Sequence, residues 1–387
     1  MKLHEYQAKE LLNRYGVPTP ANAGVVVEPG EARAAAEALG GKVVLKAQVH
    51  TGGRGKAGGI RIADTPDEAE RLAEAMLGML LTTHQAPQGV TVTKLLAEAP
   101  ISVAREFYVG IVPDRSVGRN TLIVSAMGGM DIEAVAEEHP EAIASERIDP
   151  AIGLRAYQAR RACLHGGIPG ELLPKLAPIL LALYDAYVAL DAGLVEINPL
   201  VVTADGRIVA ADAKVTVDDN AMFRHADLAA YRDEAGEDEI EAEAQRRGIQ
   251  YVRLDGTVGV MGNGAGLVMG TLDEIARAGG KAANFLDVGG GARADVVRSS
   301  LELILMNPSV ASVLVNIYGG ITRCDEVARG IVDATSTMRI GVPIVIRLAG
   351  TRSEEGAAIL AGSGFATAST MQEAARLAVE AGRSAEA

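Results

Sequence analysis

The last third of the chain alternates strictly between apolar segments and helical segments, and this pattern constrains the fold more than any other feature. The apolar segments are residues 257–261, 283–288, 312–317 and 343–348, and the helical ones are 266–278, 294–305, 325–338 and 353–360. Near-continuous apolar strands separated by helices are typical of a parallel, doubly wound sheet covered on both faces. Ligands of such a sheet bind at the carboxyl ends of its strands.

Residues 1 to about 226 follow a different pattern. The sequence predicts short helices at 31–39 and 67–77, and strands at 91–97, 106–112, 122–125, 194–202 and 207–217. Several of these strands follow one another directly, and Ala204-Asp205-Gly206 is a turn of hairpin length. We therefore predict an α+β domain with an antiparallel sheet in this part of the chain.

A highly charged segment, residues 227–250, separates the two patterns. It contains YRDEAGEDEIEAEAQRRG, which is too polar for a core but periodic enough for an exposed helix. The chain has 387 residues, whereas a single core stops growing at roughly 250 to 300 residues. The sequence thus predicts an α+β domain at 1–226, a connecting segment at 227–250 and an α/β domain at 251–387.

The composition excludes several classes of protein. With 48% hydrophobic and 22% charged residues, the chain is predicted to fold rather than to be disordered. Its net charge is −13 and it has no basic block beyond Arg54 and Lys56, which argues against nucleic-acid binding. The two cysteines are too few for a disulfide framework. Because the N-terminus lacks a signal-peptide pattern and no apolar run approaches about 18 residues, we predict a cytoplasmic protein without a membrane anchor.

The first candidate site is the segment VVLKAQVHTGGRGKAGG, residues 43–59. An apolar strand carries Lys46, and a loop follows in which Gly53 and Gly55 alternate with Arg54 and Lys56. Glycines let backbone N–H groups approach phosphate oxygens, and cations offset phosphate charge. The segment lacks the Walker pattern, so a P-loop fold is not predicted. It suits a triphosphate, although a surface hairpin with solvated cations would look the same.

The second candidate is a pair of strands, VEINPLVV at 195–202 and RIVAADAKV at 207–215. Glu196 and Asn198 are two residues apart, so they project from the same face of a strand, and an antiparallel return can bring Asp212 beside them. Three oxygen donors in otherwise apolar strands suit a hard cation such as Mg²⁺, completed by water and phosphate oxygens. The alternative is an amphipathic hairpin with a solvated polar face.

Three glycine turns follow strands of the predicted parallel sheet. The first, GVMGNGAGLVMGT at 259–271, resembles a dinucleotide-binding turn, and Asp287 lies about where a ribose-binding acid would. However, the spacing of its glycines differs from G-x-G-x-x-G. The others are DVGGGA at 287–292 and NIYGGITRCD at 316–325. Helix N-termini after such turns can bind an anion, although glycine is also common in tight turns that bind nothing.

Seven segments in order and spacing resemble the β-subunit of succinyl-CoA synthetase, also called succinate–CoA ligase. They are LHEYQAKELL at 3–12, the Lys46 strand with its loop, EINPLVVT, DDNAMFRH at 218–225, GNGAGLVMGTLD, NFLDVGGGA and VNIYGGITRCD. The resemblance runs through essentially the whole chain. It implies an N-terminal ATP-grasp domain and a C-terminal flavodoxin-like ligase domain. This sequence departs from the family pattern in SAMGGMDIE, residues 125–133, where Met127 stands at a position expected to be polar or charged in many relatives.

The resemblance implies a role for each matching residue. The residues expected to bind ATP or ADP are Lys46, Gly53, Arg54 and Gly55 at the phosphates, and Glu98, Ile101 and Glu106 at the adenine and ribose. Asn198 and Asp212 would hold Mg²⁺, and Glu196 would stabilise a phosphorylated histidine. Asn263, Gly320, Ile321 and Thr322 would lie at the substrate and phosphate end of the second domain.

The implied reaction forms succinyl-CoA, ADP and phosphate from succinate, CoA and ATP, through succinyl phosphate and a phosphohistidine, within the tricarboxylic acid cycle. In that family an α-subunit supplies the phosphohistidine and most CoA contacts, and the resemblance leaves open an αβ heterodimer or an α₂β₂ heterotetramer. The positions of the histidines in this chain are consistent with a histidine supplied by a partner, since all six precede residue 226 and none lies in the second domain. The resemblance leaves ATP and GTP open as the nucleotide.

Other functions fit parts of the sequence. A malate–CoA ligase β-subunit would share the scaffold, and assays with both acids would separate the two. A stand-alone ATP-grasp carboxylate ligase would turn over without a partner. An NAD-dependent dehydrogenase using the turn at 262–266 would bind NAD and not ATP. A structural scaffold leaves the Lys46 loop and the pairing of Asn198 with Asp212 unexplained.

Overall fold

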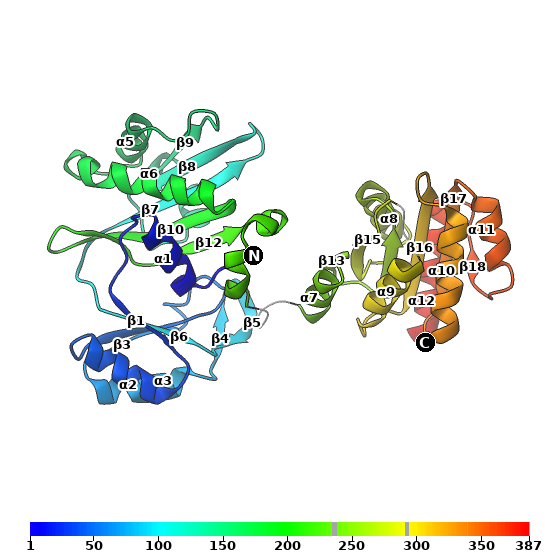
Figure 1. Cartoon of the computed structure of the whole chain (residues 1–387), viewed down its shortest axis with the longest axis horizontal. Helices are drawn as coiled ribbons and strands as arrows, with labels where there is room; N and C mark the ends of the chain where they lie inside the picture. The colour runs from blue at the N-terminus through cyan, green and yellow to red at the C-terminus, as the bar shows by residue number, and fades with distance from the viewer. Residues whose placement is uncertain (234–237, 291–293, 339, 387) are drawn as a thin grey trace. The chain divides into compact units, whose positions relative to one another are not determined.

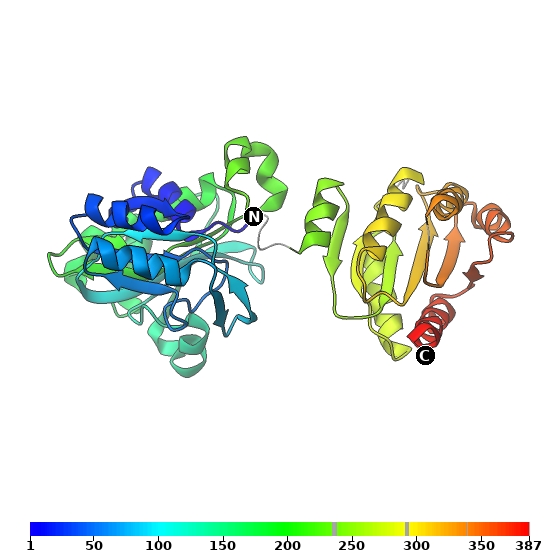
Figure 2. The same cartoon turned by 90° about the horizontal axis from the view of Figure 1, so that it is seen from below.

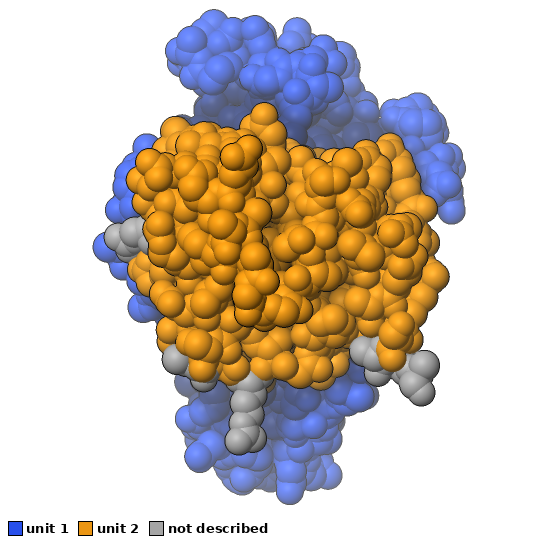
Figure 3. Space-filling model, turned by 90° about the vertical axis from the view of Figure 1, so that its right-hand side faces the viewer, with its two compact units in different colours: residues 1–236 blue, residues 237–387 orange. Residues whose placement is uncertain are grey.

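The chain divides into two compact units, residues 1–236 and 237–387. Figure 3 shows them in different colours. The computed structural model describes residues 1–233, 238–290, 294–338 and 340–386. Part of the predicted connecting segment (234–237) and the end of the second glycine turn (291–292) therefore lie outside the described residues. The division between the units falls inside the segment 227–250.

The first unit contains two main sheets. Its described strands are β1 (Asn22–Val26), β2 (Val43–Ala47), β3 (Ile60–Ala63), β4 (Leu80–Thr83), β5 (Ala86–Thr91), β6 (Leu95–Glu98), β7 (Val103–Asp114), β8 (Arg119–Ser125), β9 (Ile143–Ile148), β10 (Ala192–Thr203), β11 (Ile208–Ala210) and β12 (Lys214–Val217). Its described helices are α1 (Glu5–Arg14), α2 (Pro29–Ala38), α3 (Pro66–Met76), α4 (Ile132–Glu138), α5 (Ala156–His165) and α6 (Leu173–Ala189), with short 3-10 helices η1 (Pro140–Ala142), η2 (Gly170–Leu172), η3 (Asp219–Arg224) and η4 (Ala226–Tyr231).

The smaller main sheet has the order β1-β6-β2-β3 and is antiparallel. Helices α2 and α3 lie side by side on one face of it (Figures 1 and 2). Helix α3 starts where Thr65 Oγ1 accepts from the Glu68 amide at 3.2 Å and proline occupies the first turn, which are ordinary N-terminal signals. Alanines pack the two helices onto the strands, and the hairpin β4–β5 stands beside them.

The larger sheet has the order β11-β10-β7-β8-β9, and β12 also pairs with β10. All these pairs are antiparallel, as the sequence predicts. Its main core joins the strands to α1, α5 and α6. β11 and β12 pair with β10 in the same register, Leu200 with Ala210 and Glu196 with Lys214, so the bend between them brings Asp212 to the level of Asn198.

One helical span, Gly170–Ala189, has the length and apolar composition of a membrane-spanning helix, although no such run is predicted from the sequence. A core helix passes the same test. Leu176, Leu180 and Leu183 of this span are wholly buried in the core that includes the larger sheet. We therefore assign the span to the core of the first unit.

The second unit is a mainly parallel sheet, as predicted. Its described strands are β13 (Gln250–Arg253), β14 (Val258–Gly262), β15 (Asn284–Asp287), β16 (Ser312–Gly319), β17 (Ile344–Gly350) and β18 (Ala366–Thr367), and its described helices are α7 (Glu239–Arg246), α8 (Ala265–Arg277), α9 (Ala294–Leu305), α10 (Cys324–Thr337), α11 (Ser353–Leu360) and α12 (Met371–Glu386). The sheet order is β13-β15-β14-β16-β17-β18. Without the antiparallel edge strand β13, this is the flavodoxin order.

Two separate cores cover the two faces of this sheet. One core contains residues of α8 and α12, and the other contains residues of α7, α9, α10 and α11. Figure 1 shows helices on both sides of the strands. The sheet thus reverses its direction of growth between β14 and β16, which is where ligands bind in folds of this type.

Two sequence predictions need correction. The helix expected to be exposed in the connecting segment is α7, and it buries Ile240, Ala242 and Ala244. Its few apolar residues fall on one face and pack into the second unit's core. The strand predicted at 91–97 is interrupted, because Lys94 O accepts from the Gln48 amide at 2.9 Å and the chain passes from β5 to β6 at this point. In the second unit, β13, β18 and α12 were not predicted from the sequence.

Candidate functional site

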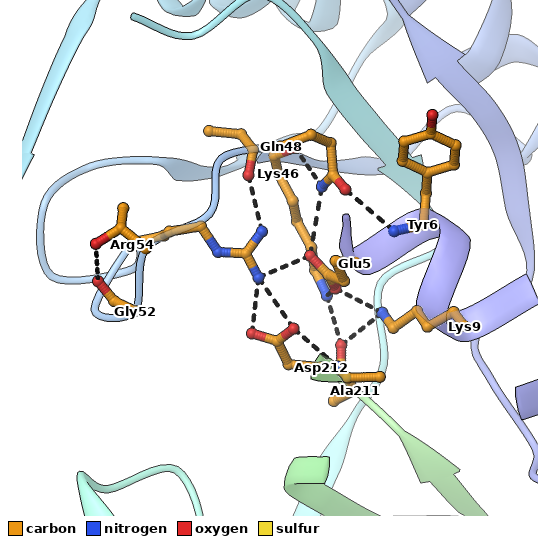
Figure 4. Close-up of polar contacts among 12 residues, drawn as sticks. Glu5, Tyr6, Lys9, Lys46, Gln48, Gly52, Arg54, Ala211 and Asp212 are labelled. Carbon is orange, nitrogen blue, oxygen red and sulfur yellow. Dashed lines mark hydrogen bonds and ion pairs between the residues drawn. The ribbon is translucent and has the colours of Figure 1, made fainter. Parts of the chain in front are cut away.

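Lys46 lies on β2 and points into the interior of the first unit rather than into solvent. Its Nζ lies 2.9 Å from Glu5 Oε1 and 2.8 Å from Glu98 Oε2, and it donates to the Ala211 carbonyl at 2.6 Å. Figure 4 shows Lys46 beside Glu5 and Ala211. Burial by itself lowers the pKa of Lys46, but the carboxylates of Glu5 and Glu98 raise it above its ordinary value. The amine is therefore held charged.

Helix α1 brings two charged side chains into the same cluster. Lys9 Nζ donates to both Glu98 oxygens at 2.7 and 2.8 Å, lies 2.7 Å from Glu5 Oε1 and shares the Ala211 carbonyl at 2.6 Å. Glu5 and Lys9 are each 2% exposed. Burial alone would raise the pKa of Glu5, but Lys9, Arg54 and Lys46 hold it well below its ordinary value.

Arg54 comes from the glycine loop and connects this cluster to the predicted metal ligand. Its Nη2 donates to Asp212 Oδ1 at 2.9 Å and Oδ2 at 2.8 Å, and lies 2.9 Å from Glu5 Oε2. Its Nη1 donates to the Ala47 carbonyl at 2.8 Å. Burial lowers the pKa of Arg54, and the facing carboxylates raise it by more. Figure 4 shows the guanidinium between Glu5 and Asp212.

The cluster balances its charges. Its three cations are Lys9, Lys46 and Arg54, and its three carboxylates are Glu5, Glu98 and Asp212. Buried charges are costly unless they are paired, so the pairing explains how six ionised groups coexist here. Asp212 is the most accessible of them, with 34% of its side chain exposed. A ligand would therefore reach the cluster at Asp212.

Asn198 ties a neighbouring loop to β10. Its Oδ1 accepts from the Gly129 amide at 2.7 Å, and its Nδ2 donates to the Met130 carbonyl at 2.7 Å. The loop lies close against β7, because a Cβ on Gly128 would stand 2.5 Å from the Phe107 carbonyl carbon. The loop that starts at Met127 is thus fixed by backbone contacts, which do not depend on a polar side chain at that position.

Glu196 lies two residues before Asn198 and opposite Lys214 on β12. The Tyr108 hydroxyl donates to Glu196 Oε2 at 3.4 Å, which is a long hydrogen bond. Burial raises the pKa of Glu196; Lys214 lowers it, and the nearby Glu133 raises it further. Glu196 therefore takes up a proton at a higher pH than an ordinary glutamate.

Asp212 and Asn198 together offer a carboxylate and an amide oxygen. Both are hard oxygen donors, and an amide oxygen has a second lone pair beyond the one that Gly129 uses. Within the ranges that the structure describes, no group of three or more His, Cys, Asp or Glu side chains is arranged to hold a metal. The two residues fit a cation that takes most of its ligands from nucleotide and water, which is how Mg²⁺ is usually bound.

The other residues predicted at the nucleotide are spread along β6, β7 and the glycine loop. Glu98 is buried in the charged cluster, whereas Glu106 on β7 is exposed and Ile101 lies half-buried between these strands. Gly53 has a φ of +74° and no heavy atom within 4 Å of a Cβ built on it, and Gly55 would meet only the Ile60 side chain, at 3.7 Å. The loop leaves room for a ligand at both glycines.

In the second unit the predicted residues gather at the carboxyl ends of β14 and β16. Asn263 Nδ2 donates to the Tyr318 carbonyl at 2.9 Å, and Asn263 Oδ1 accepts from the Tyr318 amide at 2.8 Å. Gly320 and Ile321 follow β16, and the side chain of Ile321 is 91% exposed. Thr322 is buried beside them. These residues lie at the point where the sheet reverses its direction of growth.

The side chain of Asp287 accepts hydrogen bonds from two of the glycine turns. Its Oδ1 accepts from the Gly264 amide at 2.6 Å and from the Gly289 amide at 2.7 Å. It therefore fastens two of the glycine turns to each other. The position that resembles a ribose-binding acid in the sequence is used to shape the turns.

Three members of the cluster were not predicted from the sequence: Glu5, Lys9 and the Ala211 carbonyl. A signal was present, because Glu5 and Lys9 are four residues apart in LHEYQAKELL, on the helix face that also carries Ala8 and Leu12. Charged residues on the buried face of an amphipathic helix require partners. The carbonyl could not have been found, since it depends on how the chain bends between β11 and β12.

Comparisons with known proteins agree with this architecture. Residues 2–202 match the ATP-grasp domain family, and residues 261–381 match the CoA-ligase family. The beta subunit of a GDP-forming succinate–CoA ligase from Thermus thermophilus is 52% identical over 379 residues, covering 98% of each chain. The beta subunit of an ADP-forming succinate–CoA ligase from Roseiflexus is 49% identical over 385 residues, covering 99% of this chain and 100% of that one.

A solved structure shares the fold of the chain. ATP citrate lyase from Methanothrix soehngenii, in complex with citrate and coenzyme A, has a TM-score of 0.76 at 20% identity, covering 98% of this chain and 99% of that chain. At this identity the likeness concerns the fold alone. The other functions that the sequence allows, including a malate–CoA ligase and a stand-alone ligase, are not favoured by these comparisons.

Proposed function

Because this chain belongs to the family of succinate–CoA ligase beta subunits, we propose that its first unit binds Mg-ATP at the charged cluster and passes the phosphoryl group to a partner. The chain is one subunit of an acid–thiol ligase that forms succinyl-CoA from succinate, CoA and ATP. Relatives of both the ADP-forming and the GDP-forming kind match it. Of the two nucleotides, we propose ATP for this chain.

The observation that carries the proposal is the convergence of Lys46, Arg54 and Asp212 around Glu5 and the Ala211 carbonyl. Two cations suited to phosphate oxygens lie beside a carboxylate suited to a metal. In the proposal Lys46, Arg54 and the backbone at Gly53 and Gly55 bind the phosphates. No covalent step is required of these residues, since phosphoryl transfer is accelerated mainly by positioning and electrostatics.

Other residues are assigned to the rest of the nucleotide and to the metal. Glu98, Ile101 and Glu106 follow β6 into β7, and we assign them to the adenine and ribose. Asn198 and Asp212 would hold Mg²⁺, which when bound offsets the charge of the phosphate oxygens. Asn198 can contribute its oxygen without releasing the loop at Gly129, because the Gly129 amide uses one lone pair of that oxygen and a second lone pair is left.

The acceptor of the phosphoryl group belongs to the partner in this proposal. All six histidines of the chain precede residue 226, so the glycine turns of the second unit have no histidine of their own. We assign the phosphorylated histidine and most CoA contacts to an α-subunit, with Glu196 stabilising the histidine at the first unit. Asn263, Gly320, Ile321 and Thr322 would meet the substrate and phosphate in the second unit. Cytoplasmic location stays a prediction.

The metal assignment can be tested by calorimetric titration of ATP into the chain purified with its partner subunit, with and without Mg²⁺. Asp212→Asn should remove most of the Mg²⁺-dependent part of the affinity, since it deletes the only carboxylate of the donor pair. Asp205→Asn, in an exposed turn where Asp205 pairs with Arg207 at 2.7 Å, is the matched control and should bind as wild type does. If Asp212→Asn keeps the full Mg²⁺ effect, the metal lies elsewhere.

A further inference from the structure

Arg54 forms an ion pair with Asp212, the carboxylate proposed above to bind the metal. A single guanidinium nitrogen, Nη2, lies 2.9 and 2.8 Å from the two Asp212 oxygens. Asp212 Oδ1 also accepts from the Ala213 amide at 2.8 Å. A divalent cation bound here would have to share or replace the guanidinium, because two positive groups at one carboxylate repel each other.

Arg54 would still be paired after leaving Asp212. Glu5 Oε2 lies 2.9 Å from the same Nη2, and the Ala47 carbonyl accepts from Nη1 at 2.8 Å. Glu5 is anchored in turn by Lys9 and Lys46, at 2.7 and 2.9 Å. The guanidinium is thus held from the interior of the unit, and its contact with Asp212 is on the accessible side of the cluster.

We propose that Arg54 makes metal binding depend on nucleotide binding. While the site holds no nucleotide, Arg54 is the counter-ion of Asp212 and keeps a free divalent cation away from it. When the triphosphate arrives, Arg54 turns to the phosphate oxygens and Asp212 becomes available to the metal that accompanies the nucleotide. This inference rests on the proposed Mg-ATP site and adds the order in which its charges are exchanged.

The charges of the cluster favour such an exchange. Its three cations and three carboxylates balance, so a metal ion arriving alone would add positive charge to a neutral, mostly buried group. A triphosphate arriving with the metal brings the anion that Arg54 needs once it leaves Asp212. Metal and nucleotide therefore each lower the electrostatic cost of binding the other, which is a reciprocal coupling between two ligands.

The experiment measures Mn²⁺, a paramagnetic substitute for Mg²⁺, by electron paramagnetic resonance of the free ion. It is titrated into the full-length chain, purified with its partner subunit, without nucleotide. Arg54→Ala should bind Mn²⁺ at least about tenfold more tightly than wild type, the change expected from freeing a carboxylate from one charge-assisted contact. Equal affinities in the two proteins would overturn the proposal.

Two further variants assign the effect to Asp212. In Arg54→Ala combined with Asp212→Asn the gain should disappear, and a gain that persists would contradict the exchange. Arg207→Ala removes the same charge from the Asp205 pair on the exposed turn and should leave Mn²⁺ binding unchanged; the same gain there would mean that net charge alone is responsible. Arg54→Gln, which keeps a donor for the Ala47 carbonyl, replaces the alanine variant if that variant does not fold.

The outcome separates this inference from the proposed function. If wild type fails to bind Mn-ATP at all, the proposed nucleotide site is wrong. If wild type binds Mn-ATP but Arg54→Ala gains no affinity for Mn²⁺ without nucleotide, the site stands and the exchange at Asp212 does not.

Discussion

Glu5 is a nearly inaccessible carboxylate that contacts three cations, and the stability of the first unit depends on its charge. Glu5→Gln keeps the shape but leaves Lys9, Lys46 and Arg54 with two carboxylates. Removing one partner from a buried charged network leaves charge uncompensated, so we expect a loss of about 2 to 4 kcal/mol in the free energy of unfolding. Urea unfolding of the purified chain measures it.

The matched control lies on the same helix. Glu10 pairs with Arg14 at 2.5 Å, and both side chains are about half exposed. Glu10→Gln should change the free energy of unfolding by less than about 0.5 kcal/mol, since exposed pairs contribute little. Equal losses in the two variants would mean that the cluster around Glu5 does not exist as described.

His50 gives the first unit a pH dependence. Its ring stacks on the ring of His4, with the two centroids 4.2 Å apart. Burial lowers the pKa of His50 from 6.5 to about 4; the neighbouring His4, Lys2 and Lys94 also lower it, and Asp233 raises it. In the unfolded chain His50 takes up a proton below pH 6.5 while the folded chain does not, so stability falls as the pH drops from 6.5 towards 4. His50→Gln should reduce this loss by an amount on the order of 1 kcal/mol at pH 5.

Thermal unfolding of both proteins at pH 5 and pH 7.5 tests this prediction. The difference between wild type and His50→Gln should be larger at pH 5 and should favour the variant there. A difference that does not depend on pH would show that His50 is protonated to the same extent in both states.

At this scale the sequence predicted residues but not their contacts. Lys46 and Arg54 were identified from one segment and Asp212 from another, and the structure brings the three side chains into one cluster. Their contacts could not be predicted. Glu5 pairs with both Lys46 and Arg54, and Arg54 also pairs with Asp212, so these contacts join α1, β2, the glycine loop and the bend after β11. Such contacts depend on packing between elements far apart in the sequence.

At the scale of elements, the loop at Met127–Met130 is fixed by a close approach to β7. A Cβ on Gly128 would stand 2.5 Å from Phe107 C, among backbone atoms that cannot turn aside. Gly128→Ala should therefore cost about 1 to 3 kcal/mol of stability, as overpacking does. It should also weaken Mg-ATP binding, because Asn198 bonds to this loop.

Gly30→Ala is the control for that variant. Gly30 lies in α2 with no heavy atom within 4 Å of a built Cβ, and alanine is favoured over glycine in a helix by about 1 kcal/mol. This variant should be as stable as wild type or more so. If Gly128→Ala behaves in the same way, the loop is not held against β7.

Helix α7 packs into the core of the second unit, so a cavity made in α7 should destabilise that unit. Ile240 is 5% exposed within its core, so Ile240→Ala should cost about 2 to 4 kcal/mol there. Val252→Ala, on the neighbouring strand β13 with half of its side chain exposed, should cost much less. Hydrogen exchange of the β14 and β16 amides measures the local stability. Unchanged exchange in Ile240→Ala would mean that α7 does not stabilise this core and only connects the two units.

The strand and helix pattern of the second unit was predicted well because its signal is local. Helices α9 and α11 have the predicted bounds, and apolar strands alternate with them. In contrast, β13 was missed because it is four residues long and has one buried residue, Tyr251, among exposed ones. α7 was placed in the wrong environment because the three residues it buries, Ile240, Ala242 and Ala244, are few among charges.

At the scale of the whole molecule, the two units contain complementary parts of one reaction. In the proposed function the cations and oxygen donors of the first unit bind Mg-ATP, and the second unit contains glycine turns at the switch point of a flavodoxin-like sheet. Neither unit offers a histidine beyond residue 225. We therefore propose a partner that carries the phosphoryl group. The positions of the histidines are read from the sequence, whereas the phosphohistidine on a partner is what the family resemblance implies.

The most direct test of the account is phosphotransfer from ATP labelled at the γ-phosphate to the chain purified with its partner subunit. We expect an acid-labile label on a histidine of the partner and none on this chain, and we expect succinate and CoA together to remove that label. Label that never reaches the partner, or that settles on one of the six histidines of this chain, would contradict the account.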